Sequence, residues 1–477
     1  MSGGRKKQLA KNTAILTAGK ICTQCVSFLL LPLYTAFLDP SDYGVVDLIT
    51  TYVALILPIL NLQIDMGLFR FLLDVRDDEK KQKQMISSVL NVNHIQFALF
   101  ILLFCIAQFF FSSEYKIFLA LEVVLNLYTA TLMQTARGFG RNDIYSIGSF
   151  LSTALAVAFN VIFIAVFRLG ALGMFLGLII SKIITIIYLI IHLKMWKHYS
   201  IRIYEKKQVK EVLKYSAPLV PNQLAWWTVG ASDRLVVSHF LGLAWNGIYS
   251  IANKFSTVFI TFYNIFNLAW TESSALHIDD EDSDEYLTSV VSSMFSLFSS
   301  ICIGIVACMP FVFPIMVNKK YDDAYFQIPI LLAAVLCQAV VGLISVVYTA
   351  KKKSMVLAKT TIWIAVINLV TDIALIKFIG LYAASVSTLL AYGVMMIYRY
   401  IDVQKYVRIK IPFRKVVSTL LLIAIVFSAY YIENKVLCVV ALLITVIYAV
   451  IENRLFVKDG IDTVKDAVLS IKNRGKN

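Results

Sequence analysis

Charged side chains are scarce in this sequence. Asp, Glu, Lys and Arg make up 16% of its 477 residues, while hydrophobic residues make up 59%. A soluble chain carries about 25% charged residues, so this scarcity excludes the set of soluble domains that the length alone would suggest. The apolar residues come in blocks of roughly 20, the length of a helix that spans a hydrocarbon core of ~30 Å. The sequence therefore predicts an all-α integral membrane protein.

Motifs for catalysis and cofactor binding are also lacking. The five histidines are scattered, and the chain has no GxSxG and no glycine-rich phosphate loop. The seven cysteines lie mostly within apolar runs and form no paired framework. Cys22 and Cys25 make a lone CxxC, which we interpret as small packing residues. We therefore expect no enzyme, no catalytic residues, no metal and no cofactor.

The sequence also leaves no sizeable domain outside the membrane. Without room for an ATPase, the energy for any transport must come from an ion gradient or from the substrate's own gradient. The first apolar block follows basic residues, as in a signal peptide. It is too long for one, and no cleavage site of small residues follows, so we expect it to be retained.

About fourteen apolar blocks are long enough to be membrane-spanning helices. An even number of spans puts both termini on the same side of the membrane. The predicted spans cover residues 12–37, 44–72, 85–111, 116–136, 147–167, 171–194, 215–241, 246–271, 287–316, 325–349, 356–378, 381–402, 416–432 and 436–456.

Lys and Arg are unevenly distributed between alternate loops. One set is poor in them and carries Arg168, Lys319, Lys320 and Lys435, whereas the other set and the N-terminus are much richer. The positive-inside rule places the rich loops and both termini in the cytoplasm. It accounts for the net charge of +14 better than nucleic-acid binding does, so we expect no nucleic-acid partner.

Two basic segments outside the spans have features of surface helices. The connection at 195–214 is the longest cytoplasmic one, and we expect a helix there. The tail after residue 456 has apolar residues at helical spacing and a basic end. This pattern is typical of a helix that lies on the anionic inner leaflet.

A weak internal repeat divides the chain. Residues 38–52 and 241–255 each open a span with a glycine near an aromatic residue, and residues 167–177 and 377–387 each place small residues after a glycine. The repeat predicts two parallel six-helix lobes, related by an axis along the membrane normal. We expect alternating access, with the substrate between the lobes. The predicted lobes and the extra C-terminal helices with their basic tail are residues 1–200, 201–405 and 406–477.

Ionisable groups inside membrane spans are rare and mark functional sites by default. The cations among them would line a cavity that attracts an anionic substrate, and pyrophosphate is a good candidate because Arg binds phosphate by a bidentate fork and Lys as a point charge. Arg70 lies near a span end and can instead snorkel. The candidate substrate-binding cations are Lys20, Arg70, Lys182, Arg234 and Lys254, and Glu122 is a further ionisable group in a span.

Three acids in spans are candidates for ion coupling: Asp65, Asp233 and Asp372. Asp233 precedes Arg234, about 100° away around a helix, so the two need not bond each other. Asp233 is open to three interpretations: it tunes the arginine, binds a coupling proton or sodium ion, or balances charge. Asp372 is either such a site or a paired structural charge.

Two tryptophans lie too deep for an interfacial belt. Trp226 and Trp227 are ~17 Å into their predicted span. They either pack against neighbouring helices or present ring faces to sugars.

Two stretches resemble bacterial polysaccharide biosynthesis flippases, the Wzx-type branch of the MATE-like (multidrug/oligosaccharidyl-lipid/polysaccharide) exporter superfamily. Residues 12–48 resemble the first spans of that family, and residues 230–255 resemble its second-half signature. The matching features are Gly19, Pro32, Leu33, Tyr34, Pro40, Tyr43, Gly44 and Asp47 in the first stretch, and Asp233, Arg234, Gly242, Gly247, Tyr249 and Ala252 in the second.

The resemblance implies a substrate and a setting. The substrate would be an undecaprenyl-pyrophosphate-linked oligosaccharide for O-antigen, capsule or exopolysaccharide, flipped across the bacterial cytoplasmic (inner) membrane while its lipid tail stays in the bilayer. Membrane lipid, a polysaccharide polymerase and a chain-length regulator would be partners. Relatives that flip peptidoglycan precursor carry several early arginines, whereas the first span here has Lys20. Many family members have twelve spans, so the last two here would be accessory.

Two other functions remain open from the sequence. A cation-coupled drug exporter of the same fold would favour acidic cavity residues over the cation-rich set found here. A membrane-embedded glycosyltransferase or polymerase would need a sizeable loop with a metal motif. The acidic loop at 272–285 has no recognisable ligand spacing and is better interpreted as a solvated face.

Overall fold

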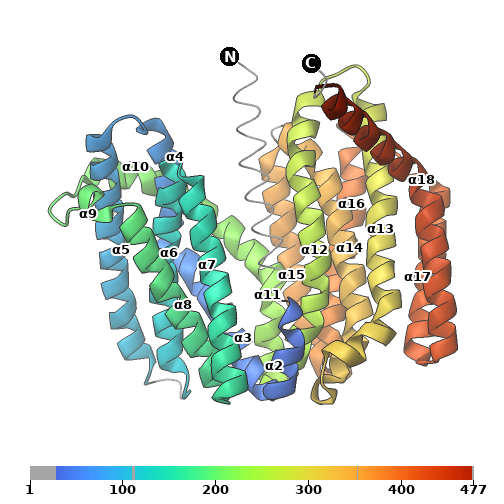
Figure 1. Cartoon of the computed structure of the whole chain (residues 1–477), viewed down its shortest axis with the longest axis horizontal. Coiled ribbons are helices and arrows are strands. Elements are labelled where there is room, and N and C mark those ends of the chain that lie inside the picture. Colours follow the sequence, from blue (N-terminus) through green and yellow to red (C-terminus); the bar gives the residue numbers. More distant parts are fainter. Residues whose placement is uncertain (1–27, 110–112, 352, 475–477) are drawn as a thin grey trace. The chain divides into compact units, whose positions relative to one another are not determined.

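The computed structural model describes residues 28–109, 113–351 and 353–474, and every regular element in those ranges is helical (Figure 1). Lys20 and most of the first predicted span lie outside them. The α-helices are α2 (Leu31–Phe37), α3 (Pro40–Asn61), α4 (Ile64–Asp74), α5 (Glu79–Ala107), α6 (Lys116–Gly138), α7 (Asn142–Asn160), α8 (Gly170–His192), α9 (Met195–His198), α10 (Lys206–Ser216), α11 (Val220–Phe240), α12 (Leu243–His277), α13 (Ser283–Met316), α14 (Asp323–Ala350), α15 (Ser354–Ile379), α16 (Tyr382–Val403), α17 (Phe413–Ile432) and α18 (Lys435–Arg474). Three short pieces join them, the π-helix η1 (Val161–Val166) and the 3₁₀-helices η2 (Ala217–Leu219) and η3 (Lys319–Tyr321).

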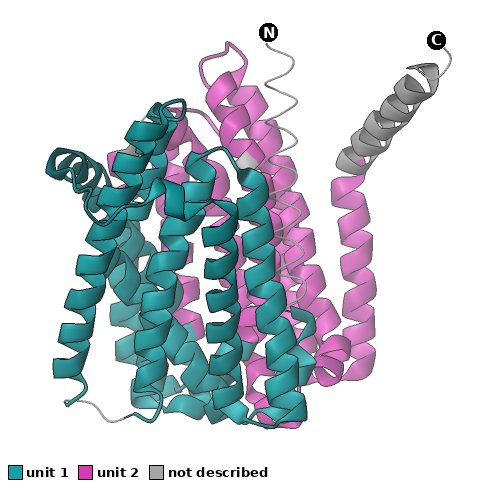
Figure 2. Cartoon of the chain, turned by 60° about the vertical axis from the view of Figure 1, so that its left-hand side comes forward, with its two compact units in different colours: residues 1–251, 361–384 teal, residues 252–360, 385–477 magenta. Residues whose placement is uncertain are grey.

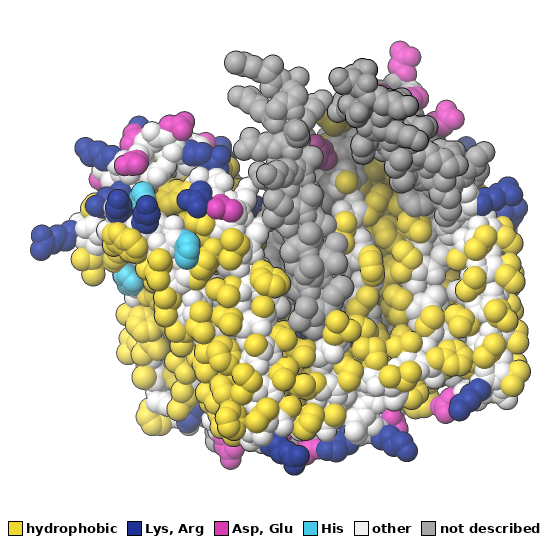
Figure 3. All heavy atoms as spheres, viewed as in Figure 1, with side chains coloured by type: hydrophobic (Ala, Val, Ile, Leu, Met, Phe, Trp, Pro, Cys, Tyr) yellow, Lys and Arg dark blue, Asp and Glu magenta, His cyan; other side chains and the backbone are white. Residues whose placement is uncertain are grey.

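Ten helices of the described ranges are long and apolar enough to cross a membrane. This confirms the all-α, multi-pass class, while the count of fourteen spans stays a prediction. On the face shown in Figure 3, hydrophobic side chains cover the middle of α5–α8, and charged ones gather toward the helix ends. Leu102, Leu103 and Ile106 of α5 are each more than half exposed. Such a surface needs an apolar solvent, which a bilayer supplies.

The chain forms two compact units (Figure 2). The first contains residues 1–251 and 361–384, and the second contains residues 252–360 and 385–477. Most of α15 thus belongs with α2–α11, and α12 contributes to both units. The predicted lobes at 1–200 and 201–405 and the segment 406–477 stay a prediction based on the repeat.

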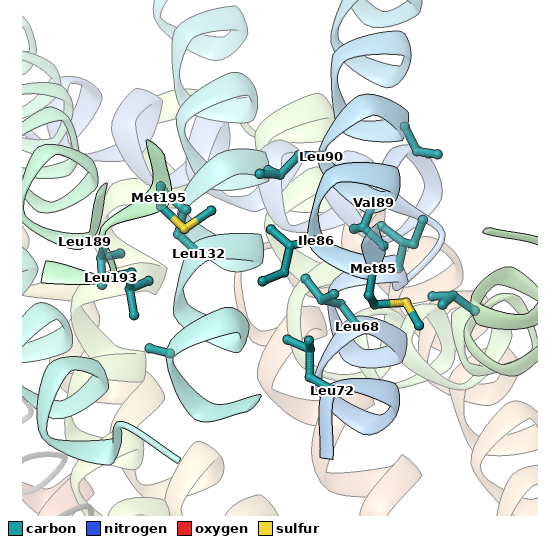
Figure 4. Close-up of a cluster of buried hydrophobic side chains, with 14 of the residues drawn as sticks. Leu68, Leu72, Met85, Ile86, Val89, Leu90, Leu132, Leu189, Leu193 and Met195 are labelled. Atoms are coloured by element: carbon teal, nitrogen blue, oxygen red, sulfur yellow. The ribbon is translucent and has the colours of Figure 1, made fainter. Parts of the chain in front are cut away.

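One hydrophobic cluster holds the first unit together at the end that carries α9 and α10. Leucines of α4 lie beside apolar side chains of α5 there, and side chains of α8 and α9 join the same cluster near Leu132 of α6 (Figure 4). The expected helix in the 195–214 connection is α10, whose Val209 and Val212 are buried in this cluster while its lysines are exposed. The apolar spacing of α10 therefore attaches a basic helix to the bundle.

The predicted span 44–72 is not one helix. Leu62 and Gln63 take left-handed backbone conformations, with φ of 52° and 53°, and separate α3 from α4. Pro58, in the last turn of α3, lacks an N–H for the helical ladder. The continuous-span prediction is wrong here because neither Leu nor Gln signals a break, and the apolar pattern continues through them.

The internal repeat has counterparts in the structure. Gly170 and Gly380, at corresponding positions, have φ of 56° and 57°, a conformation that glycine adopts without strain. Gly44 and Gly247 also correspond, and they pack against each other. A Cβ on Gly44 would lie 1.9 Å from Leu243 O, and one on Gly247 would lie 2.0 Å from the Pro40 carbonyl oxygen. Only glycines permit this reciprocal approach of α3 and α12.

In the second unit, the α17–α18 hairpin packs on α13 and α14. Tyr430 donates a hydrogen bond to Tyr325 O at 2.8 Å, and the two rings stack with centroids 4.1 Å apart. Asn453 of α18 donates to Ser300 Oγ of α13 at 2.9 Å. The last two predicted spans are therefore joined to this unit by specific contacts.

Candidate functional site

The centre of the candidate site is α11, whose two faces carry opposite charges. Pro221 stands in its first turn, where the missing N–H costs no helical hydrogen bond. Asp233 and Arg234 follow three turns later. Because neighbours on a helix point about 100° apart, their side chains reach different partners.

Arg234 faces α3. Its Nε atom lies 3.1 Å from Asp47 Oδ2, in an ion pair, and the two side chains are 24% and 17% exposed. Two turns earlier on α11, Trp227 Nε1 donates to Thr51 O of α3 at 3.2 Å. One face of α11 therefore lies along α3, and Asp47 neutralises part of the arginine's charge.

The guanidinium of Arg234 keeps its two terminal nitrogens available. In the part of the chain that the structure describes, the contact of Nε with Asp47 is an ion pair without a hydrogen bond, and the terminal nitrogens form no ion pair. One turn away, a Cβ on Gly230 would meet nothing within 4 Å. Trp226, a further turn along the same face, is 40% exposed. No described residue thus lies within 4 Å of that position beside Gly230, which is close to an arginine fork and an aromatic ring that together can bind a phosphate and a sugar face.

The adjacent face of α11, about 100° around the helix, is acidic. Asp233 is buried and accepts a hydrogen bond from Tyr249 of α12 at 2.9 Å. Asp372 of α15 is fully buried, and neither of its oxygens has a hydrogen-bond partner within the described ranges. Ser232 Oγ lies 3.4 Å from Asn368 Oδ1, so this face of α11 lies against the part of α15 that carries Asp372. Two buried carboxylates of like charge are costly unless a proton or a cation neutralises one of them.

Lys182 forms a separate buried ion pair. Its Nζ contacts Glu122 Oε2 of α6, and its side chain is 17% exposed. Asn126 also donates to the same oxygen at 3.2 Å. The pair balances the charge of Lys182, which we expected to contribute to a cationic cavity.

The remaining predicted cations lie in different settings. Arg70 is half exposed near the end of α4 and pairs with Asp74 one turn away at 2.7 Å. Lys254 is partly exposed on α12, in the second unit. The structure thus brings together Trp226, Trp227 and Arg234 on one face of α11. It brings Asp233 and Asp372 together on the other.

A cavity of about 300 Å³ lies in the second unit, apart from these residues. Aromatic and proline side chains of α13 and α14 line it, together with Glu433 and Lys435 from the α17–α18 turn. None of the predicted site residues lines this cavity.

Sequence reasoning missed three partners. The sequence identified Asp47 only as a residue shared with the flippase family and did not predict its ion pair with Arg234. It identified Glu122 as an ionisable group in a span and did not predict its ion pair with Lys182. Asn368 carries no charge, so it does not meet the criterion of an ionisable side chain inside a span. Its position four residues before Asp372, on the same helix face, was a readable signal.

Comparisons with known proteins agree with the helical membrane fold. The model of the family described as polysaccharide biosynthesis protein matches residues 9–271. A structure described as lipid II flippase MurJ in an inward closed conformation is similar, with a TM-score of 0.70 and 16% identity, covering 94% of this chain and 99% of that one.

Exporters are similar as well. An inward-facing multidrug resistance MATE family transporter of the MOP superfamily has a TM-score of 0.64 and 12% identity, covering 80% of this chain and 95% of that one. A MOP superfamily transporter from Pyrococcus furiosus, described as having a binding pocket of reverse polarity, has a TM-score of 0.52 and 12% identity, covering 83% of this chain and 96% of that one. No curated protein matches.

Proposed function

The chain belongs to the polysaccharide biosynthesis protein family, and we propose that it flips undecaprenyl-pyrophosphate-linked oligosaccharide repeat units across a bacterial cytoplasmic membrane. The polymer would be O-antigen, capsule or exopolysaccharide. The basic loops favour cytoplasmic termini. A polysaccharide polymerase and a chain-length regulator would act on the product at the outer leaflet.

The observation that carries the proposal is the state of Arg234. A guanidinium in an apolar helix, ion-paired with Asp47 at its Nε atom, retains a fork for an anion. A pyrophosphate oxygen pair fits that fork, and the open space beside Gly230 leaves room for it. Trp226 presents its exposed ring one turn further on, where the first sugar would follow the phosphates. Lys20, Arg70, Lys182 and Lys254 remain proposed contributors to the path of the head group.

The acidic face of α11 suggests how transport is powered. We propose that Asp233 and Asp372 share a proton or a sodium ion, because their burial and mutual repulsion favour a bound positive charge. Alternating access of the two lobes would then let the ion gradient drive the head group outward while the lipid tail remains in the bilayer. The same acid pair supports the second candidate, a cation-coupled drug exporter of this fold.

The deciding experiment changes Arg234 and follows polysaccharide at the cell surface. Complementation is measured in flippase-deleted strains with different repeat units, at equal protein levels in the membrane. We expect Arg234→Ala to lower export at least about tenfold, because a charge-assisted hydrogen bond contributes about 1.5–3 kcal/mol. Arg234→Lys should retain part of the activity, since Lys keeps the charge without the fork.

The matched control is Arg141→Ala. Arg141 is exposed and pairs with Asp143 outside the spans, so its loss should leave export unchanged. Full export by Arg234→Ala in every strain would refute the proposed substrate contact. Drug resistance that depends on Asp372, without any polysaccharide phenotype, would favour the exporter instead.

A further inference from the structure

Three polar side chains meet at the break between α3 and α4. Asn61 ends α3, Asp65 lies in the first turn of α4, and Gln96 reaches the break from α5. They are 2%, 8% and 6% exposed, respectively. Asn61 Nδ2 donates to Asp65 Oδ1 at 2.7 Å, and Gln96 Nε2 donates to the main-chain oxygen of Asn61 at 3.3 Å. Gln96 lies ~17 Å from the far end of α5, well inside the bilayer.

The two amides leave their oxygens without partners. Asn61 Oδ1 and Gln96 Oε1 are both buried and accept no hydrogen bond from the described residues. Rotating either amide would not help, because its oxygen would then face Asp65 Oδ1 or the Asn61 carbonyl. Asp65 Oδ1 and the Asn61 carbonyl oxygen therefore determine the orientation of the two amides. The side-chain oxygens of Asn61 and Gln96 remain without a hydrogen-bond partner among the described residues.

Asp65 also has no cationic partner among the described residues. Its carboxylate accepts a hydrogen bond from Asn61, and no side-chain hydrogen bond caps the start of α4. Helix capping therefore does not explain why an uncompensated carboxylate and two unpartnered amide oxygens lie at the break, away from water. Such groups are costly to bury unless something positive binds them.

We propose that the α3–α4 break binds a sodium ion through Asn61 Oδ1, Gln96 Oε1 and the Asp65 carboxylate. Hard oxygen donors suit such an ion, and a single carboxylate matches a single positive charge. Divalent cations in proteins usually take more carboxylates or keep several waters. No group of three or more His, Cys, Asp and Glu that could hold a metal is present in the described ranges.

The ion would connect the break to the candidate substrate site. It would neutralise Asp65 and tie the end of α3 to α4 and α5. The same helix α3 carries Asp47, the partner of Arg234. Its role in transport rests on the proposed function, whereas binding of the ion does not.

The test measures thermal unfolding of the purified full-length protein in detergent. Sodium chloride is exchanged for choline chloride at constant ionic strength. We expect the midpoint to rise with sodium and to follow the logarithm of its concentration above the Kd, by about 2–4 °C when sodium exceeds the Kd about tenfold. Asn61→Leu and Gln96→Leu should each lose the part of that rise that the break contributes. If Asn61→Leu does not fold, Gln96→Leu still tests whether sodium binds at the break, because this substitution leaves the break between α3 and α4 unchanged.

Three controls separate this site from others. Asn160→Leu removes an equally buried amide with an unpartnered oxygen on α7, and it should keep the sodium response. Asp372→Asn removes any sodium that the acid pair binds, so the response that remains in this variant should come from the break and should disappear when Gln96→Leu is added. Arg234→Ala should keep it even if it abolishes transport, so failure of the proposed function and failure of this site are distinguishable.

Two results would overturn the proposal. One is an unchanged sodium response in Gln96→Leu, or a response that Asp372→Asn abolishes. The other is a wild-type midpoint that is indifferent to sodium but shifts with pH through Asp65, which would make a proton the occupant.

Discussion

At the scale of single residues, partners decide what an intramembrane charge can do. Lys182 is paired with Glu122, whereas Arg234 shares only one side of its guanidinium with Asp47. Both are cations on apolar helices, and nothing in their local sequence distinguishes them. The partners come from helices far away in the chain, so their identity follows from packing and not from the pattern around each cation.

Removing one member of the Lys182–Glu122 pair should destabilise the protein. Glu122→Gln leaves an ammonium that is 17% exposed without its counter-charge, and we expect a loss on the order of 2–3 kcal/mol. Thermal unfolding in detergent measures it. The double variant with Lys182→Gln removes both charges and should recover most of the wild-type midpoint. Equal midpoints for Glu122→Gln and the wild type would show that the pair contributes no stability.

The same double variant separates two roles of Lys182. We expect export to stay impaired although stability is recovered, because Gln does not replace the proposed contact of Lys182 with pyrophosphate. Wild-type export by the stable double variant would assign Lys182 a structural role alone.

At the scale of helices, glycine positions determine how closely α3 and α12 approach. Gly44→Ala would place a Cβ 1.9 Å from a main-chain oxygen, which cannot move aside as a flexible side chain can. Overpacking of this kind costs about 1–3 kcal/mol, and we expect a lower unfolding midpoint and reduced export. Gly247→Ala should behave alike because the contact is reciprocal. Gly304→Ala, on α13 with nothing within 4 Å, serves as the control and should be neutral or slightly stabilising. A tolerated Gly44→Ala would contradict the close packing.

Helices were more predictable than their interruptions. Long apolar runs predicted most spans, because a bilayer imposes their length and composition. The repeat predicted the glycines that adopt matching conformations at Gly170 and Gly380. The break at Leu62 and Gln63 could not be predicted, because their left-handed conformations follow from tertiary packing. Uncharged polar residues such as Asn61 and Gln96 were missed for a related reason, since an amide becomes informative only when its partners are known.

At the scale of the whole molecule, the orientation rests on the distribution of Lys and Arg. The segment 195–214, which contains α9 and most of α10, is basic, whereas the loops before α14 and α18 hold few basic residues. The positive-inside rule therefore predicts that α10 lies in the cytoplasm and that η3 and the start of α18 lie outside. The direction of proposed transport depends on this assignment.

Single cysteines in a cysteine-free background test the orientation and the number of spans together. In spheroplasts, a membrane-impermeant maleimide should label Lys319→Cys and Lys435→Cys, because both lysines are exposed and predicted to lie outside. Lys207→Cys, on the exposed face of α10, should react only after permeabilisation, and Lys410→Cys, before α17, should behave the same way. The opposite labelling pattern at all four sites would show that the protein has the inverted orientation in the membrane. If Lys410→Cys alone reacted from outside, the number of spans between α10 and α17 would be odd instead of even, and the division into two parallel six-helix lobes would be wrong.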